Sequence, residues 1–325
     1  RFWGTPLPIW RTEDETESIC IGSIMELNTA ILHAREVLGR NINEAFVDGI
    51  RDLHKPYVDE IILASPTGKP MRRVPDLVDV WFDSGAMPYA QWHYPFENKE
   101  IFKTAFPADF IAEGVDQTRG WFYTLHALAV LLFDSVAYKT VVSNGLVLDK
   151  SGNKMSKRLG NVVDPFQTLS LYGADATRWY LITNASPWDS LKFDEEGIKE
   201  VQRKFFGTLY NTYQFFALYA NVDRFTFKEA YIPYRERPET DRWILSSLQS
   251  LITKVTDNLD NYEPTQAGRH IEEFVDSHLS NWYVRLSRRR FWKGEYGTDK
   301  ISAYQTLYEC METLCGLIAP IAPFF

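Results

Sequence analysis

Short apolar runs alternate with a longer helical run in the middle of the chain. The segments DFIAEG (109–114), TVVSNG (140–145) and LVLD (146–149) have the composition of strands, and residues 120–133 have that of a helix. Strand and helix alternating at this spacing predict a parallel sheet with crossover helices. Ligands bind beyond the carboxyl ends of the strands in such sheets, so Glu113, Asn144 and Gly145 are expected at the edge of a site.

Helical periodicity dominates the rest of the chain. Helices are predicted over 24–38 and 241–259, the latter with Thr240 or Asp241 as its cap, and a further one after Pro264. The apolar stripe of the second helix is Trp243, Ile244, Leu248, Leu251, Ile252, Val255 and Leu259. The stripe of the third is Ile271, Phe274, Val275, Leu279, Trp282 and Leu286.

The predicted fold class is therefore α/β plus all-α. Four segments are distinguished: a connecting region at 1–78, half of a parallel-sheet domain at 79–187, a helical junction at 188–235 and a helical bundle at 236–325. A length of 325 residues is enough for about two domains with their own cores.

Composition excludes several classes of function. The longest apolar run, residues 125–133, is too short to cross a bilayer, and no signal peptide opens the sequence, so a cytoplasmic protein without membrane contact is expected. A net charge of −8 argues against non-specific nucleic-acid binding, so any RNA contact must be local. Cys20, Cys310 and Cys315 lack Cys-x-x-Cys spacing and are expected to be buried thiols.

The turn DKSGNKMSKRLGNVVDP (149–165) places three cations, Lys154, Lys157 and Arg158, around the hydroxyl of Ser156. Cations this close repel each other unless an anion shares their space. Such a turn can donate hydrogen bonds to the β and γ phosphates of ATP and stabilise the charge on departing pyrophosphate. Flexibility at residues 151 and 152 would let it close over the nucleotide. The alternative is a solvated basic hairpin.

The segment NKMSKRLGNVVDP (153–165) resembles the second signature of class I aminoacyl-tRNA synthetases. DFIAEGVDQTRGWFYTL (109–125) resembles the strand and helix before that signature in the isoleucine-specific family. RFWGTPLPIW, VPDLVDVWFDSGAMPYA and LSNWYVRLSRRRFW resemble the same family in the same order, so the likeness spans nearly the whole chain. The resemblance implies the carboxyl-side half of a Rossmann-like catalytic domain at 79–187, a stem-contact junction at 188–235 and the start of an anticodon-binding domain at 236–325.

The resemblance also implies a reaction: isoleucine, ATP with Mg²⁺ and tRNA(Ile) are the expected partners of an isoleucine--tRNA ligase. Lys154, Ser156 and Lys157 match its catalytic residues. The residues matching those that bind ATP or the adenylate are Glu113, Asp116, Asn144, Gly145, Met155 and Lys157. Those matching the amino-acid pocket are Trp81, Gln117 and Trp121. The expected tRNA contacts are Arg285, Arg288, Arg289 and Lys293.

Each assignment has a plainer alternative. Carboxylates such as Glu113 and Asp116 often cap helices or line a solvated rim, and the arginine cluster could pair with acidic residues on its own helix. Those acidic residues are Glu272, Glu273 and Asp276. Four other tryptophans are expected to be core residues: Trp3, Trp10, Trp179 and Trp243.

Three departures from the family pattern stand out. Arg158 occupies the position that is usually serine, as in the eukaryote-like branch of the family. Cysteine pairs are missing near residues 11–20 and 61–70, where some relatives bind structural zinc, so no metal is predicted there. None of the six histidines lies in a His-x-Gly-His pattern, the other nucleotide-binding signature of the class.

We therefore expect a fragment of a monomeric parent enzyme, without the amino-side half of the sheet and the editing insertion, and unable to form isoleucyl-adenylate alone. Two rival functions are a non-catalytic tRNA-binding paralogue of a class I synthetase and a nucleotidyltransferase for small substrates. The first would be expected to lose the lysines or the pocket residues, and the second gives no reason for the helical tail with its arginines.

Overall fold

A computed structural model describes residues 4–50, 52–293 and 295–325. The chain divides into two compact units, one formed by residues 1–111 and 116–141 and the other by residues 112–115 and 142–325. Within the described residues, no helix is both long and apolar enough to span a membrane.

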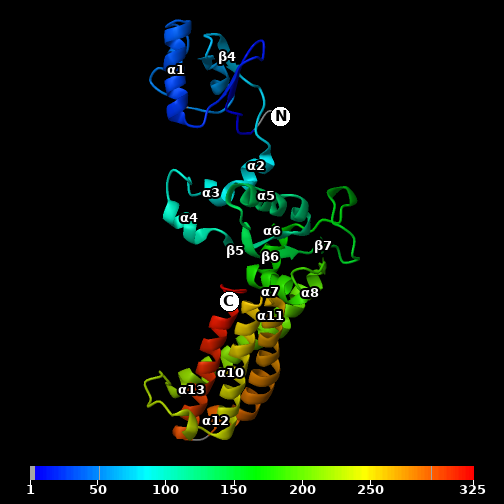
Figure 1. Cartoon of the computed structure of the whole chain (residues 1–325). Helices are drawn as coiled ribbons and strands as arrows, with labels where there is room; N and C mark the ends of the chain where they lie inside the picture. Colours follow the sequence, from blue (N-terminus) through cyan, green and yellow to red (C-terminus); the bar gives the residue numbers. More distant parts are fainter. Residues whose placement is uncertain (1–3, 51, 294) are drawn as a thin grey trace. The chain divides into compact units, whose positions relative to one another are not determined.

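The first unit begins with a small antiparallel sheet of order β2-β1-β4-β3. Its strands are β1 (Ile9–Thr12), β2 (Ser18–Cys20), β3 (Ile62–Ala64) and β4 (Pro70–Arg73). Helix α1 (Ile24–Leu38), which has the predicted bounds, packs against this sheet (Figure 1). The short helices η1 (Glu44–Phe46) and η2 (Tyr57–Glu60) join α1 to β3. The shared core is Trp10, Ile21, Leu27, Ile31, Val58, Ile61, Leu63 and Met71.

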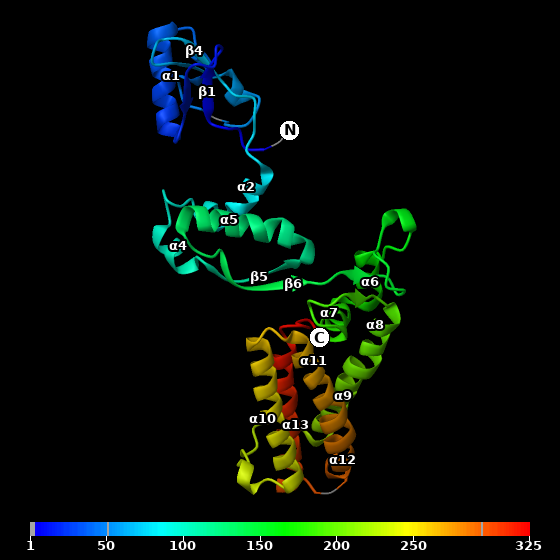
Figure 2. The same cartoon turned by 45° about the vertical axis from the view of Figure 1, so that its right-hand side comes forward.

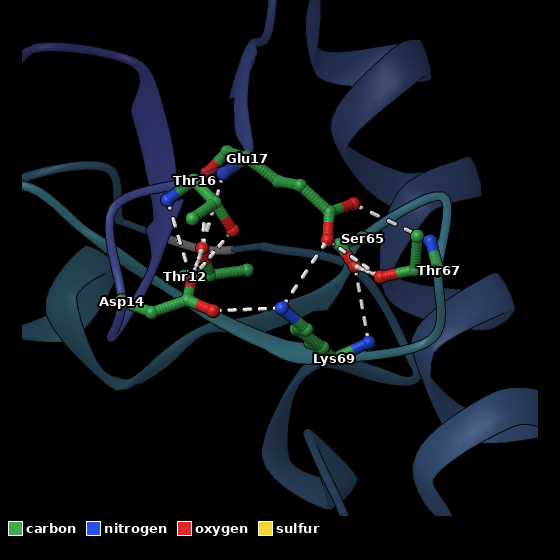
Figure 3. Close-up of polar contacts among 7 residues, drawn as sticks. All are labelled: Thr12, Asp14, Thr16, Glu17, Ser65, Thr67 and Lys69. Atoms are coloured by element: carbon green, nitrogen blue, oxygen red, sulfur yellow. Dashed lines mark hydrogen bonds and ion pairs between the residues drawn. The ribbon is translucent and has the colours of Figure 1, made fainter.

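The turns of the two hairpins are joined by polar side chains, shown in Figure 3. We call this the turn cluster; it consists of Thr12, Asp14, Thr16, Glu17, Ser65, Thr67 and Lys69. Lys69 Nζ lies 2.7 Å from Asp14 Oδ2, and Thr67 Oγ1 donates to Glu17 Oε1 at 2.5 Å. The Lys69 ammonium and the threonine hydroxyls hold the pKa of Asp14 well below its ordinary value, because they stabilise its charged form.

The turn cluster lies in the two segments for which no metal is predicted. Among the described residues, no group of three His, Cys, Asp or Glu side chains is arranged to hold a metal ion. That the parent protein binds no structural zinc here stays a prediction. The ion pair and the hydroxyl bonds hold together two turns whose bonded residues are 50 and 55 positions apart in sequence.

The next part of the chain forms a strand-helix-strand unit. Strands β5 (Ala108–Gly114) and β6 (Tyr138–Asn144) pair with each other, and α5 (Trp121–Phe133) connects them after the short helix η3 (Val115–Arg119). Ala108 N donates to Ala137 O at 3.0 Å, which joins the two strand beginnings as in a parallel pair. Figure 2 shows α5 running along this pair. Before β5 lie the helices α2 (Val80–Gly85), α3 (Met87–Ala90) and α4 (Lys99–Ala105).

The second unit continues with a two-residue strand and then becomes helical. Strand β7 (Val147–Leu148) pairs in parallel with β8 (Leu191–Lys192), a strand in the segment predicted to be helical, and this pair is separate from the pair of β5 and β6. Between the two strands in sequence lie η4 (Lys157–Leu159), α6 (Pro165–Tyr172) and α7 (Ala174–Asn184), and α8 (Glu195–Val201) follows β8. A π-helical turn, η5 (Gln202–Phe206), leads into α9 (Gly207–Asp223).

A helical bundle completes this unit, as predicted, with its helices side by side in Figures 1 and 2. After η6 (Tyr234–Glu236) come α10 (Glu239–Asp260) and α11 (Pro264–Glu273). The π-helical η7 (Phe274–Val284) then runs directly into α12 (Arg285–Trp292), and α13 (Thr298–Ile318) ends the bundle. The buried faces of these helices share one apolar core.

Asp241 is not the cap of α10, and neither is Thr240, because that helix begins at Glu239 and its N-cap, Pro238, makes no side-chain bond. The Asp241 side chain is fully buried instead. Its carboxylate accepts hydrogen bonds from Tyr283 and Ser302 at 2.9 and 2.6 Å, and Arg290 approaches it at 2.5 Å. A buried carboxylate is tolerated only when it is paired and hydrogen-bonded, and these partners satisfy both conditions.

The predicted stripe of the helix after Pro264 holds for its first four residues and fails for the last two. Leu279 is fully buried, but Trp282 and Leu286 are 56% and 58% exposed. The π-helical segment η7 places extra residues in its turns, and this shifts the buried face of the helix. Tyr283 and Phe291 therefore face the core in place of the predicted pair.

Other burial predictions have mixed outcomes. Trp10 and Trp179 are core residues as predicted, whereas Trp243 is 37% exposed and the prediction for it is wrong. Trp3 lies outside the described residues. Cys310 is a buried thiol as expected, and the thiols of the other two cysteines, Cys20 and Cys315, are exposed.

The turn cluster predicts acid sensitivity of the first unit. Because the folded-state pKa of Asp14 lies below its ordinary value of 3.8, its contribution to stability is complete above that pH and is lost as the pH falls through the folded pKa. Asp14→Asn should lower stability at neutral pH and flatten its dependence on pH below about pH 4. The indole NMR signal of Trp10, whose Nε1 donates to Ile61 O at 3.0 Å, reports unfolding of this unit in urea. Glu13→Gln, at an exposed position of the same turn, is the control and should leave the pH curve unchanged.

The shifted register of η7 predicts unequal effects for two identical substitutions. Leu279→Ala should destabilise the bundle by about 2–5 kcal/mol because it opens a cavity in the core. Leu286→Ala should change stability by less than about 0.5 kcal/mol, because that side chain is exposed. Urea unfolding followed by helical circular dichroism measures both, and similar losses would indicate an uninterrupted α-helix.

Candidate functional site

The cationic turn is built on the side chain of Asp149. Asp149 Oδ1 accepts hydrogen bonds from Ser151 N at 2.9 Å and Asn153 N at 2.8 Å. Gly152 N donates to Asp149 O at 2.9 Å, with Gly152 at a φ of 86° that suits glycine. Residues 151 and 152, predicted to be flexible, thus form a hydrogen-bonded turn, and their mobility stays a prediction. We call residues 149–161 the lysine turn.

Asn161 closes the other end of the lysine turn. Its Nδ2 donates to Asp149 Oδ2 at 2.8 Å, and its Oδ1 accepts from Ser156 N at 2.8 Å. The bond from Asn161 and those from the backbone lower the pKa of Asp149, because they stabilise its carboxylate. Sequence patterns single out neither residue, because an aspartate and an asparagine are common in any polar turn.

The three cations that are predicted to bind phosphate are exposed. Lys154, Lys157 and Arg158 have no acidic partner within ion-pair distance in the described part of the chain, whereas the neighbouring Lys150 lies 3.0 Å from Asp194. The mutual repulsion of these three charges is therefore not relieved by a carboxylate. The arrangement can bind an anion with several charged oxygens.

Ser156 and Met155 have further roles between these cations. Ser156 Oγ accepts from Arg158 N at 3.2 Å and caps η4, so its hydroxyl proton remains available to a ligand. Met155 is half-buried and packs against the apolar core of the second unit, which anchors the middle of the turn. The predicted contact of its backbone with adenine stays a prediction.

The predicted strand-end residues lie where β5 and β6 finish. Glu113 is exposed near the end of β5, and Asn144 is half-buried at the end of β6. Gly145 N donates to Pro187 O at 2.8 Å, and a Cβ on Gly145 would lie 2.2 Å from Asp189 O. The chain's own backbone thus makes the close approach that requires glycine at this position.

The three predicted pocket residues meet in the first unit. Gln117 Oε1 accepts from Trp121 N at 3.0 Å. A Cβ on Gly120 would lie 2.9 Å from Gln117 Oε1 and 3.1 Å from Trp81 Cη2, so Gly120 leaves room for both side chains. Trp121 Nε1 donates to Ser84 O at 3.0 Å, which fixes the indole ring. Asp116 is exposed in η3, in the same unit.

The predicted tRNA-contacting residues form an exposed surface on and just after α12. We call Arg285, Arg288, Arg289 and Lys293 the basic face. None of the four has an acidic partner in the described residues. Arg290, between them, points inward to Asp241.

The carboxylates proposed as alternative partners of the basic face are engaged elsewhere. Glu272 accepts from Trp179 Nε1 at 2.6 Å, and its burial raises its pKa. Glu273 lies 3.9 Å from His270, and Asp276 accepts from Asn281 Nδ2 at 2.8 Å. The plainer alternative, in which these carboxylates neutralise the arginines, is not what the structure shows.

Comparison with protein families agrees with the fold. The family model described as "tRNA synthetases class I (I, L, M and V)" matches residues 1–194. A second model, described as "Anticodon-binding domain of tRNA ligase", matches residues 241–325. The chain belongs to the class I tRNA synthetases of this group.

Similar curated proteins include isoleucine--tRNA ligases. That of Cytophaga hutchinsonii is 67% identical over 325 residues, that of Bacteroides fragilis 63% over 339 residues, and that of Thermus thermophilus 49% over 324 residues. Each match covers the whole of this chain. The chain spans 29% to 30% of the length of these relatives.

Solved structures show the same fold at lower identity. One is the ternary complex LeuRS-tRNA-LeuAMS of Agrobacterium radiobacter K84, whose matching chain is 21% identical with a TM-score of 0.70. The match covers 99% of this chain and 38% of that chain. Methionyl-tRNA synthetase of Mycobacterium tuberculosis, bound by methionyl-adenylate, is 19% identical with a TM-score of 0.63. That match covers 96% of this chain and 63% of the other. The predicted fold class is confirmed.

Proposed function

We propose that this chain supplies the phosphate-handling half of the active site of an isoleucine--tRNA ligase. The parent enzyme would activate L-isoleucine with ATP and transfer it to tRNA(Ile). The observation that carries the proposal is the lysine turn, where three exposed cations flank Ser156 in sequence and have no acidic partner in the described residues. The identity of 63% to 67% with isoleucine--tRNA ligases supports isoleucine as the amino acid.

The lysine turn would act on ATP. In the proposed reaction the isoleucine carboxylate attacks the α-phosphorus, and the bond from that phosphorus to the bridging oxygen of pyrophosphate breaks. Lys154 and Lys157 donate to the β and γ phosphates and stabilise the charge that accumulates on the leaving pyrophosphate, with Mg²⁺ arriving as part of the ATP substrate. Arg158 adds a permanent charge beside them. Positioning supplies most of the acceleration, and no covalent enzyme intermediate forms.

The remaining site residues would hold the adenylate and the amino acid. Exposed Glu113 and Asp116 are suited to accept hydrogen bonds from the ribose hydroxyls and the substrate ammonium group. Asn144, Gly145 and the backbone of Met155 would lie against the adenine. The side chains around Gly120 would receive the aliphatic side chain of isoleucine by apolar contact: Trp81, Gln117 and Trp121.

The proposal extends to the organisation of the chain. Residues 1–78 would connect an editing insertion to the catalytic domain, 79–187 would belong to that domain, 188–235 to the stem-contact junction, and 236–325 would begin the anticodon-binding domain. With no His-x-Gly-His pattern among its six histidines, this polypeptide alone would not form isoleucyl-adenylate. The parent enzyme would be a monomer acting in the cytoplasm.

Substitution of Lys157 tests the proposed chemistry. In the full-length parent enzyme, Lys157→Ala should lower kcat for isoleucine-dependent ATP–pyrophosphate exchange by about 100- to 1,000-fold, as expected when one donor to a developing charge is removed. Lys150→Ala is the matched control: this lysine is paired with Asp194, so exchange should change by less than about fivefold. Unchanged exchange in the Lys157 variant would contradict the proposed role of the lysine turn, whereas a parent protein with no exchange at all would favour the non-catalytic tRNA-binding paralogue.

We also propose that the basic face contacts tRNA, because its four cations have no acidic partner in the described residues. A triple substitution of Arg285, Arg288 and Arg289 to Gln in the parent enzyme should weaken tRNA(Ile) binding. It should reduce the slope of log K against log salt by roughly 0.7–0.9 for each phosphate that the variant no longer neutralises. Binding titrations over a range of salt concentrations measure both effects.

The control for the basic face has the same change in net charge. It is a triple substitution to Gln of Lys103, Lys139 and Lys199, each paired with a carboxylate. This variant should keep the parent slope. If both triple variants weaken binding equally, the effect belongs to net charge and the proposed tRNA-binding role of the basic face is wrong.

A further inference from the structure

The lysine turn is closed at its base by two side chains, which we call the clasp: Asp149 and Asn161. They lie twelve residues apart in sequence and are joined by the 2.8 Å bond from Asn161 Nδ2 to Asp149 Oδ2. Asp149 also accepts hydrogen bonds from the backbone N–H groups of Ser151 and Asn153. One carboxylate therefore binds the first residues of the turn and the last one together.

Asn161 additionally binds the backbone between the two lysines. Its Oδ1 accepts from Ser156 N at 2.8 Å, and its Nδ2 also approaches Lys154 O at 3.3 Å. These backbone groups lie on either side of Met155. The amide thus fixes the peptide groups that separate Lys154 from Lys157, without touching either ammonium group.

Other contacts of the turn are the ion pair of Lys150 with Asp194 at 3.0 Å and short-range backbone bonds within the turn. Leu159 is 64% exposed, and a Cβ on Gly160 would meet no atom within 4 Å. Apolar anchoring comes from Met155 and Val163, which pack against the apolar core of the second unit. At the start of the turn, Asp149 N donates to Asn153 O at 2.9 Å, and a bridge joins Leu148 to Lys154.

We propose that Asp149 and Asn161 are positioning residues, which hold Lys154 and Lys157 at the spacing needed to stabilise the leaving pyrophosphate. The inference rests on the proposed function, because it assigns to the clasp a share of the same reaction. Like charges on a free loop would move apart, and each lysine would then be displaced from the phosphates. Misplacement of a positioned group by about 1 Å can reduce a rate by up to about 100-fold.

Variants of the clasp in the full-length parent enzyme test the proposal. Asn161→Ala removes all three bonds of the amide, and Asn161→Asp places a second carboxylate against Asp149. Each should lower kcat for isoleucine-dependent ATP–pyrophosphate exchange by about 10- to 100-fold. KM for isoleucine should stay the same, because the proposed amino-acid pocket is built from other elements, α2, η3 and α5.

A swapped pair provides the rescue. In the double variant Asp149→Asn with Asn161→Asp, the amide at position 149 can donate to the carboxylate at position 161, which still accepts from Ser156 N. We expect this variant to recover most of the kcat that Asn161→Asp removes. Asn153→Ala is the control, because Asp149 binds the backbone N–H of that residue at 2.8 Å and its side chain only at 3.5 Å.

The outcomes separate the inference from the function on which it rests. If Lys157→Ala lowers kcat but the clasp variants stay within about twofold of the parent, the clasp does not position the lysines and the inference is wrong. If the clasp variants raise KM for isoleucine and lower the melting temperature together with kcat, their role is structural only and the inference is also wrong. If Lys157→Ala has no effect on exchange, the proposed function itself fails.

Discussion

Repulsion among the cations of the lysine turn is the constraint on which the proposed site depends. Two unit charges 4 Å apart in water interact by about 1 kcal/mol, and by about 4 kcal/mol at the effective dielectric constant near a protein surface. Lys154, Lys157 and Arg158 lie within five residues of one another in sequence, and all three are exposed. No carboxylate pairs with these cations within the described residues. A bound polyanion would therefore be the group that neutralises them.

The buried cations of the chain show the opposite arrangement. Arg73, Arg237 and Arg290 have little or no exposed side-chain surface, and each makes an ion pair with a carboxylate at 2.5–2.6 Å. A buried guanidinium without a partner would retain its desolvation penalty, so pairing is required inside the protein. Exposed cations carry no such requirement. Their lack of partners at the lysine turn and at the basic face is therefore compatible with stability, and it leaves them free to bind an anion.

The sequence predicts those parts of the fold whose pattern repeats. Helix α1 has the expected bounds, and β5, α5 and β6 lie within two residues of expectation, because their apolar runs are long enough to show a period. The four-stranded sheet of the first unit is missed, because its strands have only three or four residues. The exposure of Trp282 is missed as well, since a π-helical segment changes the period inside one helix.

The candidate site divides in the same way. The charge of a side chain follows from its residue type, so the three cations can be identified in the sequence. The resemblance to a family then predicts their function. The clasp cannot be found so easily, because a bond between Asp149 and Asn161 depends on how the intervening eleven residues turn. Gly145 is a similar case: glycine indicates a close approach, but only the structure identifies the approaching group as the backbone at Asp189.

The position of the clasp bears on what the four letters KMSK can establish. Both of its residues lie outside those four positions, yet one of them binds the backbone on each side of Met155. If the clasp positions the lysines as proposed, a chain could keep every lysine of the signature and lose the spacing between them by a single change at position 161. On that proposal, the lysines, the aspartate before them and the asparagine after them act as one unit in the handling of phosphate.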